Sequence, residues 1–315
     1  MRCFTDTAPP PLTTMYPARN PGQPLDLEWL ESVQVDDVAI TAQAAEIDQS
    51  CEDVGTHHAA WLIRAIQCMD LTTLSGDDTP ERVKTLCESA RAPLPADLAE
   101  RYGAGGLTVG AVCVYHAMIA PALSALKGTD IPVAAVSAGF PAGLSSPRAR
   151  VVEVEESVAA GATEIDIVIP RHLALSGDWP GLYDDIRALR TACGKAHLKC
   201  ILSVGELGDL TTVARASLTA MMAGADVVKT STGKEATNAT LPAALAMLNM
   251  IHAYHQATGY QIGFKPAGGI STARAALPFM AATYARLGPD WLQPTLFRFG
   301  ASSLLKDIRA TLAAS

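Results

Sequence analysis

The chain has 315 residues, of which 24 are Lys or Arg and 32 are Asp or Glu, so its net charge at neutral pH is −8. Nucleic acid binding needs a basic face that displaces counterions, and we therefore expect no nucleic acid partner. Hydrophobic residues make up 49% of the chain, which excludes a disordered protein and is enough for a large core. The length fits two ordinary domains or one α/β barrel.

The cysteine and histidine patterns argue against a disulfide framework or a metal site. The chain has seven cysteines, an odd number, and none forms a C-x-x-C pair, which favours a reducing compartment, so we expect the cytoplasm. The adjacent His57 and His58 have no third ligand near them in the sequence, and we interpret them as surface residues. We see no apolar run near the roughly 18 residues of a membrane span and no apolar N-terminal signal, so we expect no membrane partner.

The first 50 residues differ from the rest of the chain. Six prolines fall within residues 1–24, where apolar periodicity is weak, and this predicts a disordered tail. Residues 25–50 are acidic and contain alanines, which predicts one helix outside the main domain. We therefore expect residues 1–50 to form an N-terminal extension and residues 51–315 to form the main domain.

From residue 51 onward, eight short apolar or β-branched runs alternate with amphipathic stretches. The predicted strands are 68–74, 107–115, 131–140, 163–170, 197–204, 225–230, 260–265 and 296–300. The predicted helices are 57–67, 79–90, 150–160, 182–193, 211–223, 241–254 and 272–287. At the start of the second helix, Thr79 is a plausible N-cap and Pro80 suits the first helical position.

Eight strand–helix units in about 250 residues predict a closed (β/α)₈ TIM barrel of class α/β. The rival fold is an open, doubly wound sheet, which normally carries a glycine fingerprint after its first strand. The segment after the first predicted strand has no such fingerprint, and the Gly-rich segment 103–110 precedes a strand instead of following one.

Two lysines end neighbouring predicted strands, Lys229 in ADVVK and Lys265 in IGFK. A single lysine at a strand end is more often one whose stem packs while its ammonium reaches solvent. Two of them would crowd at the carboxyl face of a barrel, where reacting groups lie. At about 4 Å and an effective dielectric of about 20, repulsion would lower the pKa of one from about 10.4 to about 7.5. A free amine there can form a Schiff base with an aldehyde or ketone.

Three further charged residues lie within predicted strands. Asp166 shares a strand face with Glu164, and we interpret it as a proton carrier beside the imine, although a structural ion pair is the alternative. Asp70 and Lys199 either pair with each other or join the same network.

Three turns rich in Gly, Ser and Thr follow the last three predicted strands. Such turns bring backbone N–H groups close to an anion, and barrels often hold phosphate after strands seven and eight. The residues that we expect to bind substrate or phosphate are Thr232, Gly233, Gly268, Gly269, Gly300, Ser302 and Ser303.

Together these segments resemble the deoxyribose-phosphate aldolase family over about residues 60–305. The segments that carry the resemblance are DLTTLSGDDT, AVCVY, EIDIVIP, GEL, VVKTSTGK, GFKPAGG and FRFGASSLL. The resemblance implies a carbon–carbon lyase that reversibly cleaves 2-deoxy-D-ribose 5-phosphate to D-glyceraldehyde 3-phosphate and acetaldehyde, without a metal or other cofactor. It implies that this phosphosugar is the substrate in deoxyribonucleoside catabolism, and we also expect a homo-oligomer, a dimer.

The resemblance also assigns roles to individual residues. It makes Lys229 the Schiff-base lysine, Lys265 the neighbour that lowers the pKa of Lys229, and Asp166 the proton donor or acceptor, through a water. Cys113 matches a residue near the site that the mechanism does not require. In place of the tyrosine tail with which the family often ends, the last tyrosine here is Tyr284, in a predicted helix. Proton transfer is therefore expected to rely on Asp166, Lys265 and water.

Two other functions remain open at this point. A different Schiff-base barrel, such as a transaldolase-like enzyme, would use the same lysine on another phosphosugar. A barrel that has lost activity and acts as a binding partner would need only the Pro-rich N-terminal segment as its contact.

Overall fold

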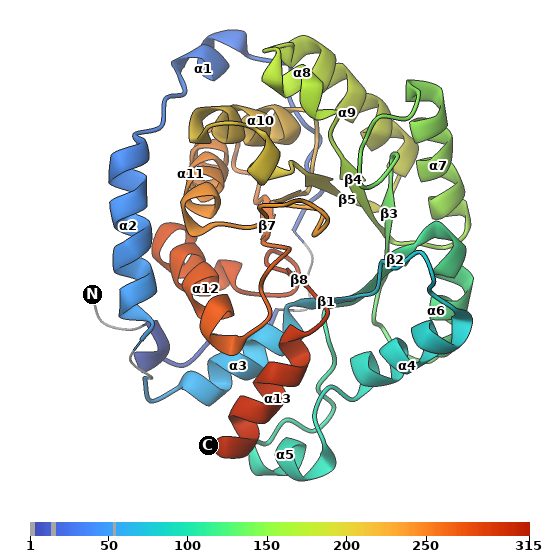
Figure 1. Cartoon of the computed structure of the whole chain (residues 1–315), viewed down its shortest axis with the longest axis vertical. Helices are drawn as coiled ribbons and strands as arrows, with labels where there is room; N and C mark the ends of the chain where they lie inside the picture. The colour runs from blue at the N-terminus through green and yellow to red at the C-terminus, as the bar shows by residue number, and fades with distance from the viewer. Residues whose placement is uncertain (1–3, 14–16, 53–54) are drawn as a thin grey trace.

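The computed structural model describes residues 4–13, 17–52 and 55–315, and its centre is a single sheet of eight parallel strands (Figure 1). The strands are β1 (Met69–Thr72), β2 (Ala111–Tyr115), β3 (Val133–Ser137), β4 (Glu164–Val168), β5 (His197–Ile201), β6 (Val227–Lys229), β7 (Gly263–Lys265) and β8 (Phe299–Ala301). Seven of them lie inside the predicted ranges, and β8 begins three residues later and ends one residue later than predicted.

The sheet closes on itself. Its hydrogen-bonded order runs β7-β6-β5-β4-β3-β2-β1-β8, and every pairing is parallel. The two ends meet through parallel bridges from Phe264 to Phe297 and from Ala267 to Gly300. This closure confirms the (β/α)₈ barrel and excludes the open, doubly wound sheet.

A ring of helices surrounds the strands (Figure 1). They are α1 (Leu27–Ser32), α2 (Asp37–Ser50), α3 (His58–Gln67), α4 (Pro80–Arg91), α5 (Ala96–Arg101), α6 (Ile119–Ala125), α7 (Pro147–Ala159), α8 (Arg171–Leu175), α9 (Trp179–Cys193), α10 (Leu210–Met222), α11 (Leu241–Thr258), α12 (Ala273–Leu287) and α13 (Leu304–Ala314). Short 3₁₀ turns lie at η1 (Phe4–Asp6), η2 (His116–Met118), η3 (Val204–Glu206) and η4 (Pro289–Trp291). The predicted cap of α4 is confirmed, because the side chain of Thr79 accepts a hydrogen bond from the Arg82 N–H and Pro80 follows at the first position.

The main core lies between the barrel and the helices. Outward-facing strand residues such as Ile165 and Ile167 are fully buried there, together with the inner faces of α10 and α11. The opposite faces of the strands point into the barrel, where most of the buried charges are found. This alternation is the period-2 pattern of a strand that is buried on both sides.

The described part of the predicted tail is packed, contrary to the expectation from composition. Asn20 is 3% exposed, and its side-chain amide donates to the carbonyls of Met221 and Ala225. Phe4 packs on Trp61, whose indole N–H donates to the Thr7 carbonyl at 2.7 Å. Hydrogen bonds and a few aromatic contacts thus hold a segment that is poor in apolar residues. Residues 1–3 and 14–16 of that tail lie outside the described residues.

The predicted single helix over residues 25–50 is two helices. Asp36 caps α2 by accepting hydrogen bonds from the N–H groups of Val38 and Ala39, and α1 ends four residues earlier. In Figure 1, α2 runs along α11 and α12, which agrees with the contacts of these helices. The extension therefore lies on the barrel, while its status as a separate unit stays a prediction.

Candidate active site

The interior of the barrel holds a cluster of seven charged side chains, none more than 3% exposed. Each strand places its member by alternation, which turns the neighbouring apolar residues outward. The cluster consists of Asp70 (β1), Glu164 and Asp166 (β4), Lys199 (β5), Lys229 (β6), Lys265 (β7) and Arg298, which precedes β8 by one residue.

Lys229 and Lys265 converge as predicted. They are register partners on β6 and β7, and the Nζ atoms of both donate to the same oxygen, Oδ2 of Asp166. The distances from this oxygen are 2.8 Å to Lys229 and 2.7 Å to Lys265. Two nitrogens that share one acceptor at these distances lie close together, so the predicted proximity of the two lysine amines is confirmed.

The pKa values of the two lysines move apart. Burial is the largest cause that lowers the pKa of Lys229, and the charge of Lys265 lowers it further, against the pull of Asp166. Burial also opposes the charge of Lys265, but Asp166 and Asp70 outweigh it and raise the pKa of Lys265. The expectation that repulsion alone makes Lys229 a free amine was therefore incomplete, because loss of solvent contributes more.

Asp166 is held as a carboxylate. Burial favours its neutral form, but the charges of Lys199, Lys229 and Lys265 together keep its pKa well below the ordinary value. An ionised carboxylate between two amines can accept a proton once one of those amines has become an iminium.

Asp70 and Lys199 pair with each other and also join the same network, so both alternatives from the sequence hold. The Lys199 Nζ lies 2.6 Å from Glu164 Oε2, 2.8 Å from Asp166 Oδ1 and 3.4 Å from Asp70 Oδ2. Asp70 also accepts hydrogen bonds from Lys265 and Arg298. The sequence reasoning missed Arg298, although its place between the outward-facing Phe297 and Phe299 is a period-2 signal for an inward side chain.

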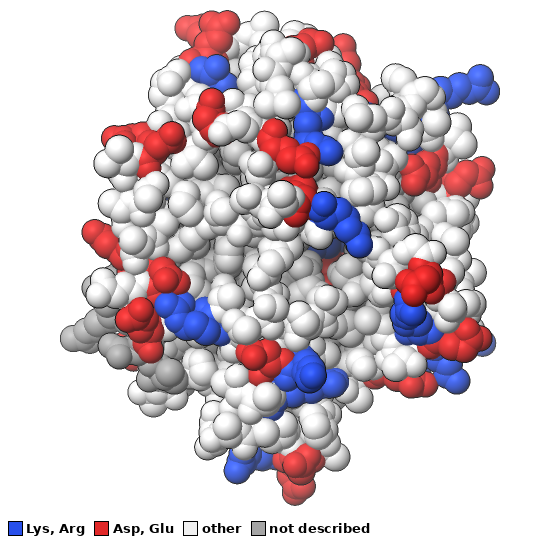
Figure 2. Space-filling model, viewed as in Figure 1, with Lys and Arg blue, Asp and Glu red and all other residues white. Residues whose placement is uncertain are grey.

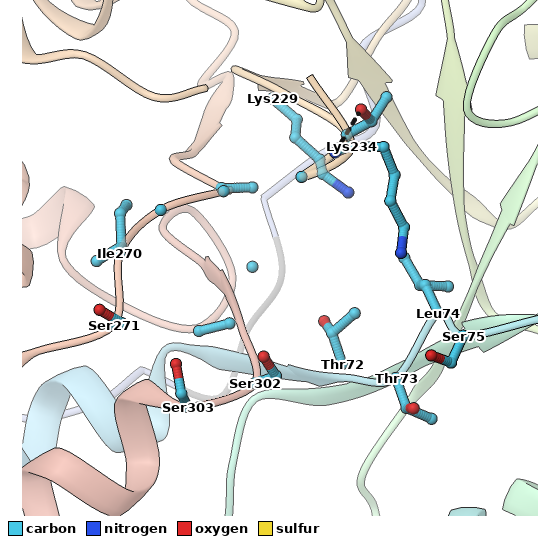
Figure 3. A pocket seen from close by; sticks show the side chains of 17 residues that line it. Thr72, Thr73, Leu74, Ser75, Lys229, Lys234, Ile270, Ser271, Ser302 and Ser303 are labelled. Carbon is cyan, nitrogen blue, oxygen red and sulfur yellow. Dashed lines mark hydrogen bonds between the residues drawn. The ribbon is translucent and has the colours of Figure 1, made fainter. Parts of the chain in front are cut away.

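A cavity of about 400 Å³ opens at the carboxyl ends of the strands, with Lys229 in its wall (Figure 3). It brings together every residue that we expected to bind substrate or phosphate, from the loops after β6 and β7 and from the end of β8 with the turn that follows it. Those residues are Thr232, Gly233, Gly268, Gly269, Gly300, Ser302 and Ser303. Their role in phosphate binding stays a prediction.

Glycine is required at two of these positions. Gly268 has φ +83°, and a Cβ there would lie 2.5 Å from Oδ1 of Asn238. A Cβ on Gly300 would lie 3.3 Å from Cε of Lys265, so this glycine makes room for the lysine. The contact between Gly300 and Lys265 had no signal in the sequence.

Other residues of the cavity wall had no predicted role. Lys234, Thr72, Thr73, Ser75 and Ser271 line the cavity. Figure 3 shows the amines of Lys229 and Lys234 projecting into the space, with Thr72, Ser271, Ser302 and Ser303 across from them. Lys234 lies in the TSTGK segment, and a lysine directly after a glycine turn is the sequence signal that could have predicted its place in the cavity wall.

Cys113 lies on a different wall of the barrel interior. It is fully buried with Ala134 and Val136, and Leu74, Tyr115 and Phe140 pack against this group. Burial raises the pKa of the Cys113 thiol, which keeps it neutral and a poor nucleophile. Tyr284 lies on α12, where it contacts Phe4 and Trp61.

Comparison with known proteins agrees with this geometry. The model of the DeoC/LacD family aldolases matches residues 64–309. The human protein named deoxyribose-phosphate aldolase is 50% identical over 295 residues, covering 92% of this chain and 93% of its own. The mouse protein of the same name is 50% identical over 291 residues, covering 91% and 92%.

A solved structure of the deoxyribose phosphate aldolase from Aeropyrum pernix shares the fold. Its TM-score is 0.61 at 22% identity, and the match covers 85% of this chain and 98% of that one. The family model and the close relatives show that this chain belongs to the DeoC/LacD family of aldolases.

Proposed function

We propose that this protein is a deoxyribose-phosphate aldolase, a lyase that reversibly cleaves 2-deoxy-D-ribose 5-phosphate to D-glyceraldehyde 3-phosphate and acetaldehyde. Relatives of that name are 50% identical over more than nine tenths of the chain. The observation that carries the proposal is the amine of Lys229, whose pKa is lowered by burial, which bonds to Asp166 and which lies in the wall of the cavity.

The first chemical stage is imine formation. The neutral amine of Lys229 attacks C1 of the open-chain sugar, and loss of water gives an iminium on the lysine nitrogen. Lys265, held as an ammonium by Asp166 and Asp70, disfavours a proton on Lys229 before this attack. The barrel thereby supplies a nucleophile without external activation.

The second stage breaks the C2–C3 bond. Asp166 takes the proton of the C3 hydroxyl through a water, the C2–C3 bond breaks with its electrons moving into the iminium, and glyceraldehyde 3-phosphate leaves. The remaining enamine takes a proton at carbon, and water then hydrolyses the iminium, which releases acetaldehyde and restores the amine. Asp166 Oδ2 accepts hydrogen bonds from both the reacting nitrogen of Lys229 and the ammonium of Lys265.

The phosphate of the substrate is assigned to the far side of the cavity. Gly233, Gly268 and Gly269 have positive φ and bring backbone close to the space, and Ser302 and Ser303 lie before α13. Lys234 adds a positive charge at the same opening. Backbone N–H groups, hydroxyls and one cation suit a phosphate dianion.

A coupled assay for glyceraldehyde 3-phosphate, with deoxyribose 5-phosphate as substrate, tests this function. Equal amounts of acetaldehyde and glyceraldehyde 3-phosphate are expected. If the protein instead forms no acetaldehyde but cleaves another phosphosugar, the transaldolase-like alternative is correct. If no phosphosugar is cleaved, the enzymatic proposal is wrong.

We further propose that the protein works as a homo-oligomer, a dimer, in the cytoplasm. The Aeropyrum pernix relative is described as a tetramer, and light scattering on the purified chain measures the assembly here.

Within the described residues, no helix is both long and apolar enough to cross a membrane. On the face in Figure 2, acidic and basic side chains are interspersed and no single basic patch forms. Cell fractionation tests the location.

A further inference from the structure

The buried cluster has unequal numbers of acidic and basic side chains. Three are carboxylates and four are bases, so the charges balance only when one base is neutral. An unbalanced charge in a buried site is strongly disfavoured. Arginine does not lose its proton in proteins, so the neutral member must be a lysine.

The contacts single out Lys229 as that lysine. Among the described carboxylates, Lys199 lies within 3.4 Å of three and Lys265 bonds to two, whereas Lys229 bonds to one, Asp166, through the Oδ2 that it shares with Lys265. Lys229 is therefore the least compensated cation of the cluster. The structure connects its neutrality to the total charge of the cluster and not to one neighbour alone.

Arg298 is the permanent cation that completes this balance. Its Nη2 lies 2.9 Å from Glu164 Oε1, and its Nη1 donates to both Asp70 and Glu164 Oε2. It is 3% exposed, and its Nε donates to the Pro294 carbonyl, which fixes the guanidinium. Arg298 bonds to Asp70 and Glu164, so its influence on the amine passes through these carboxylates.

We propose that Arg298 is a positioning residue that keeps Lys229 an uncharged amine by neutralising Asp70 and Glu164 beneath the catalytic cavity. Without the guanidinium, three carboxylates would face three lysines, and the balance would require a proton on Lys229. Without the Glu164 carboxylate, the cluster would hold an excess of positive charge, and Lys229 would lose its proton more easily. The two changes act in opposite directions and should cancel when combined.

The protonation of Lys229 depends on the charged and titratable groups around it. Strands β2 and β3 contribute the uncharged Ala134 and Val136 and the thiol Cys113. The others are Asp70, Glu164, Asp166, Lys199, Lys265, Arg298 and, at the cavity mouth, Lys234. Arg298 and Glu164 bond to each other and to Asp70 or Lys199, so either can be changed without removing a hydrogen bond of Lys229 or Lys265.

The test measures the protonation of Lys229 directly. The full chain is labelled with trace acetic anhydride from pH 5 to pH 10, and mass spectrometry follows acetylation of Lys229 relative to the exposed Lys84. The variants are Arg298→Gln, Glu164→Gln, the double variant and Arg298→Lys. A buried unit charge roughly 10 Å from an amine moves its pKa by about 1 at an effective dielectric of about 20.

The labelling midpoint of Lys229 should rise by about 1 pH unit in Arg298→Gln and fall in Glu164→Gln. It should return to the wild-type value in the double variant and stay there in Arg298→Lys. An unmoved midpoint in Arg298→Gln overturns the inference, as does a shift of both single variants in the same direction, which a merely structural role would produce. If Arg298→Gln does not fold, an unmoved or raised midpoint in Glu164→Gln overturns it.

The inference rests on Lys229 as the nucleophile of the proposed function, but the labelling does not depend on aldolase turnover. Opposite shifts in a protein that cleaves no sugar would refute the proposed function alone. An active wild-type enzyme whose variants keep the same midpoint would refute the role of Arg298 alone.

Discussion

Two walls of the same barrel interior differ sharply. Strands β2 and β3 turn small uncharged side chains inward, whereas the other strands supply the seven buried charges. The uncharged wall lacks groups that would solvate a charge, which strengthens the interactions on the opposite wall. The reactive amine of Lys229 therefore depends on both walls, because one carries charge and the other excludes water. The inward residues of the uncharged wall are Cys113, Ala134 and Val136.

The largest expected effect comes from the charged wall. Replacing Lys265 with Leu removes the cation beside Lys229, so the pKa of Lys229 should rise and less free amine should remain at neutral pH. We expect the rate of deoxyribose phosphate cleavage to fall by about 10²-fold at pH 7, with the ascending limb of the pH–rate profile moved to higher pH. Steady-state kinetics from pH 6 to pH 10 measure both.

Lys265→Arg serves as the control, because it keeps the positive charge and should move the profile less than Lys265→Leu. A lower rate with an unmoved pH profile in Lys265→Leu would show that Lys265 acts on the reaction in another way. The contrast between the two walls would then not rest on the protonation of Lys229.

A smaller effect is expected at the glycine-rich rim. In Gly268→Ala, the new Cβ would collide with Asn238 at a residue with φ +83°, so the loop must shift. KM for deoxyribose phosphate should rise by about 10-fold, which corresponds to about 1.4 kcal/mol of lost binding, while kcat changes less. The measurement is a comparison of deoxyribose phosphate with unphosphorylated deoxyribose.

Gly259→Ala is the matched control for backbone strain. Gly259 has φ +77° at the end of α11, and nothing lies within 4 Å of its added Cβ. This variant should lose about 1 kcal/mol of stability and keep its KM. Equal loss of affinity for both sugars in Gly268→Ala would remove the rim from phosphate recognition.

The smallest effect is expected on the uncharged wall. Cys113→Ala keeps this wall apolar and removes one buried sulfur atom, so it should reduce the unfolding free energy by about 1 kcal/mol. The rate should stay within about 3-fold of wild type, since the buried neutral thiol is not a nucleophile. Denaturant unfolding and the coupled assay measure the two quantities. A loss of activity as large as that of Lys265→Leu would show that the uncharged wall takes part in the chemistry, which contradicts the contrast between the walls.

Sequence reasoning reached the barrel and most of the site because charged residues inside apolar strands are conspicuous. Asp166, Lys229 and Lys265 each interrupt such a run, and alternation alone puts them in the interior. Arg298 lies inside the predicted strand 296–300 but was missed, because its partners Asp70 and Glu164 come from strands far away in the sequence. Residue spacing cannot show such pairings.

Two further features of the structure could not be predicted from the sequence. The depth of burial of Lys229 decides how far its pKa falls, and burial depends on the whole fold. The packing of the N-terminal segment rests on hydrogen bonds such as those of Asn20 to backbone carbonyls of the barrel. Composition reports apolar surface, not such bonds, and therefore predicted a tail there.

The most direct test of the account is reductive trapping of the imine. The protein is incubated with acetaldehyde and borohydride at pH 7, and peptides are mapped by mass spectrometry, with Lys229→Met as the control. We predict one N-ethyl group on Lys229 and loss of activity in proportion to labelling. An active protein with an unmodified Lys229, or with the label on Lys265, would contradict the assignment.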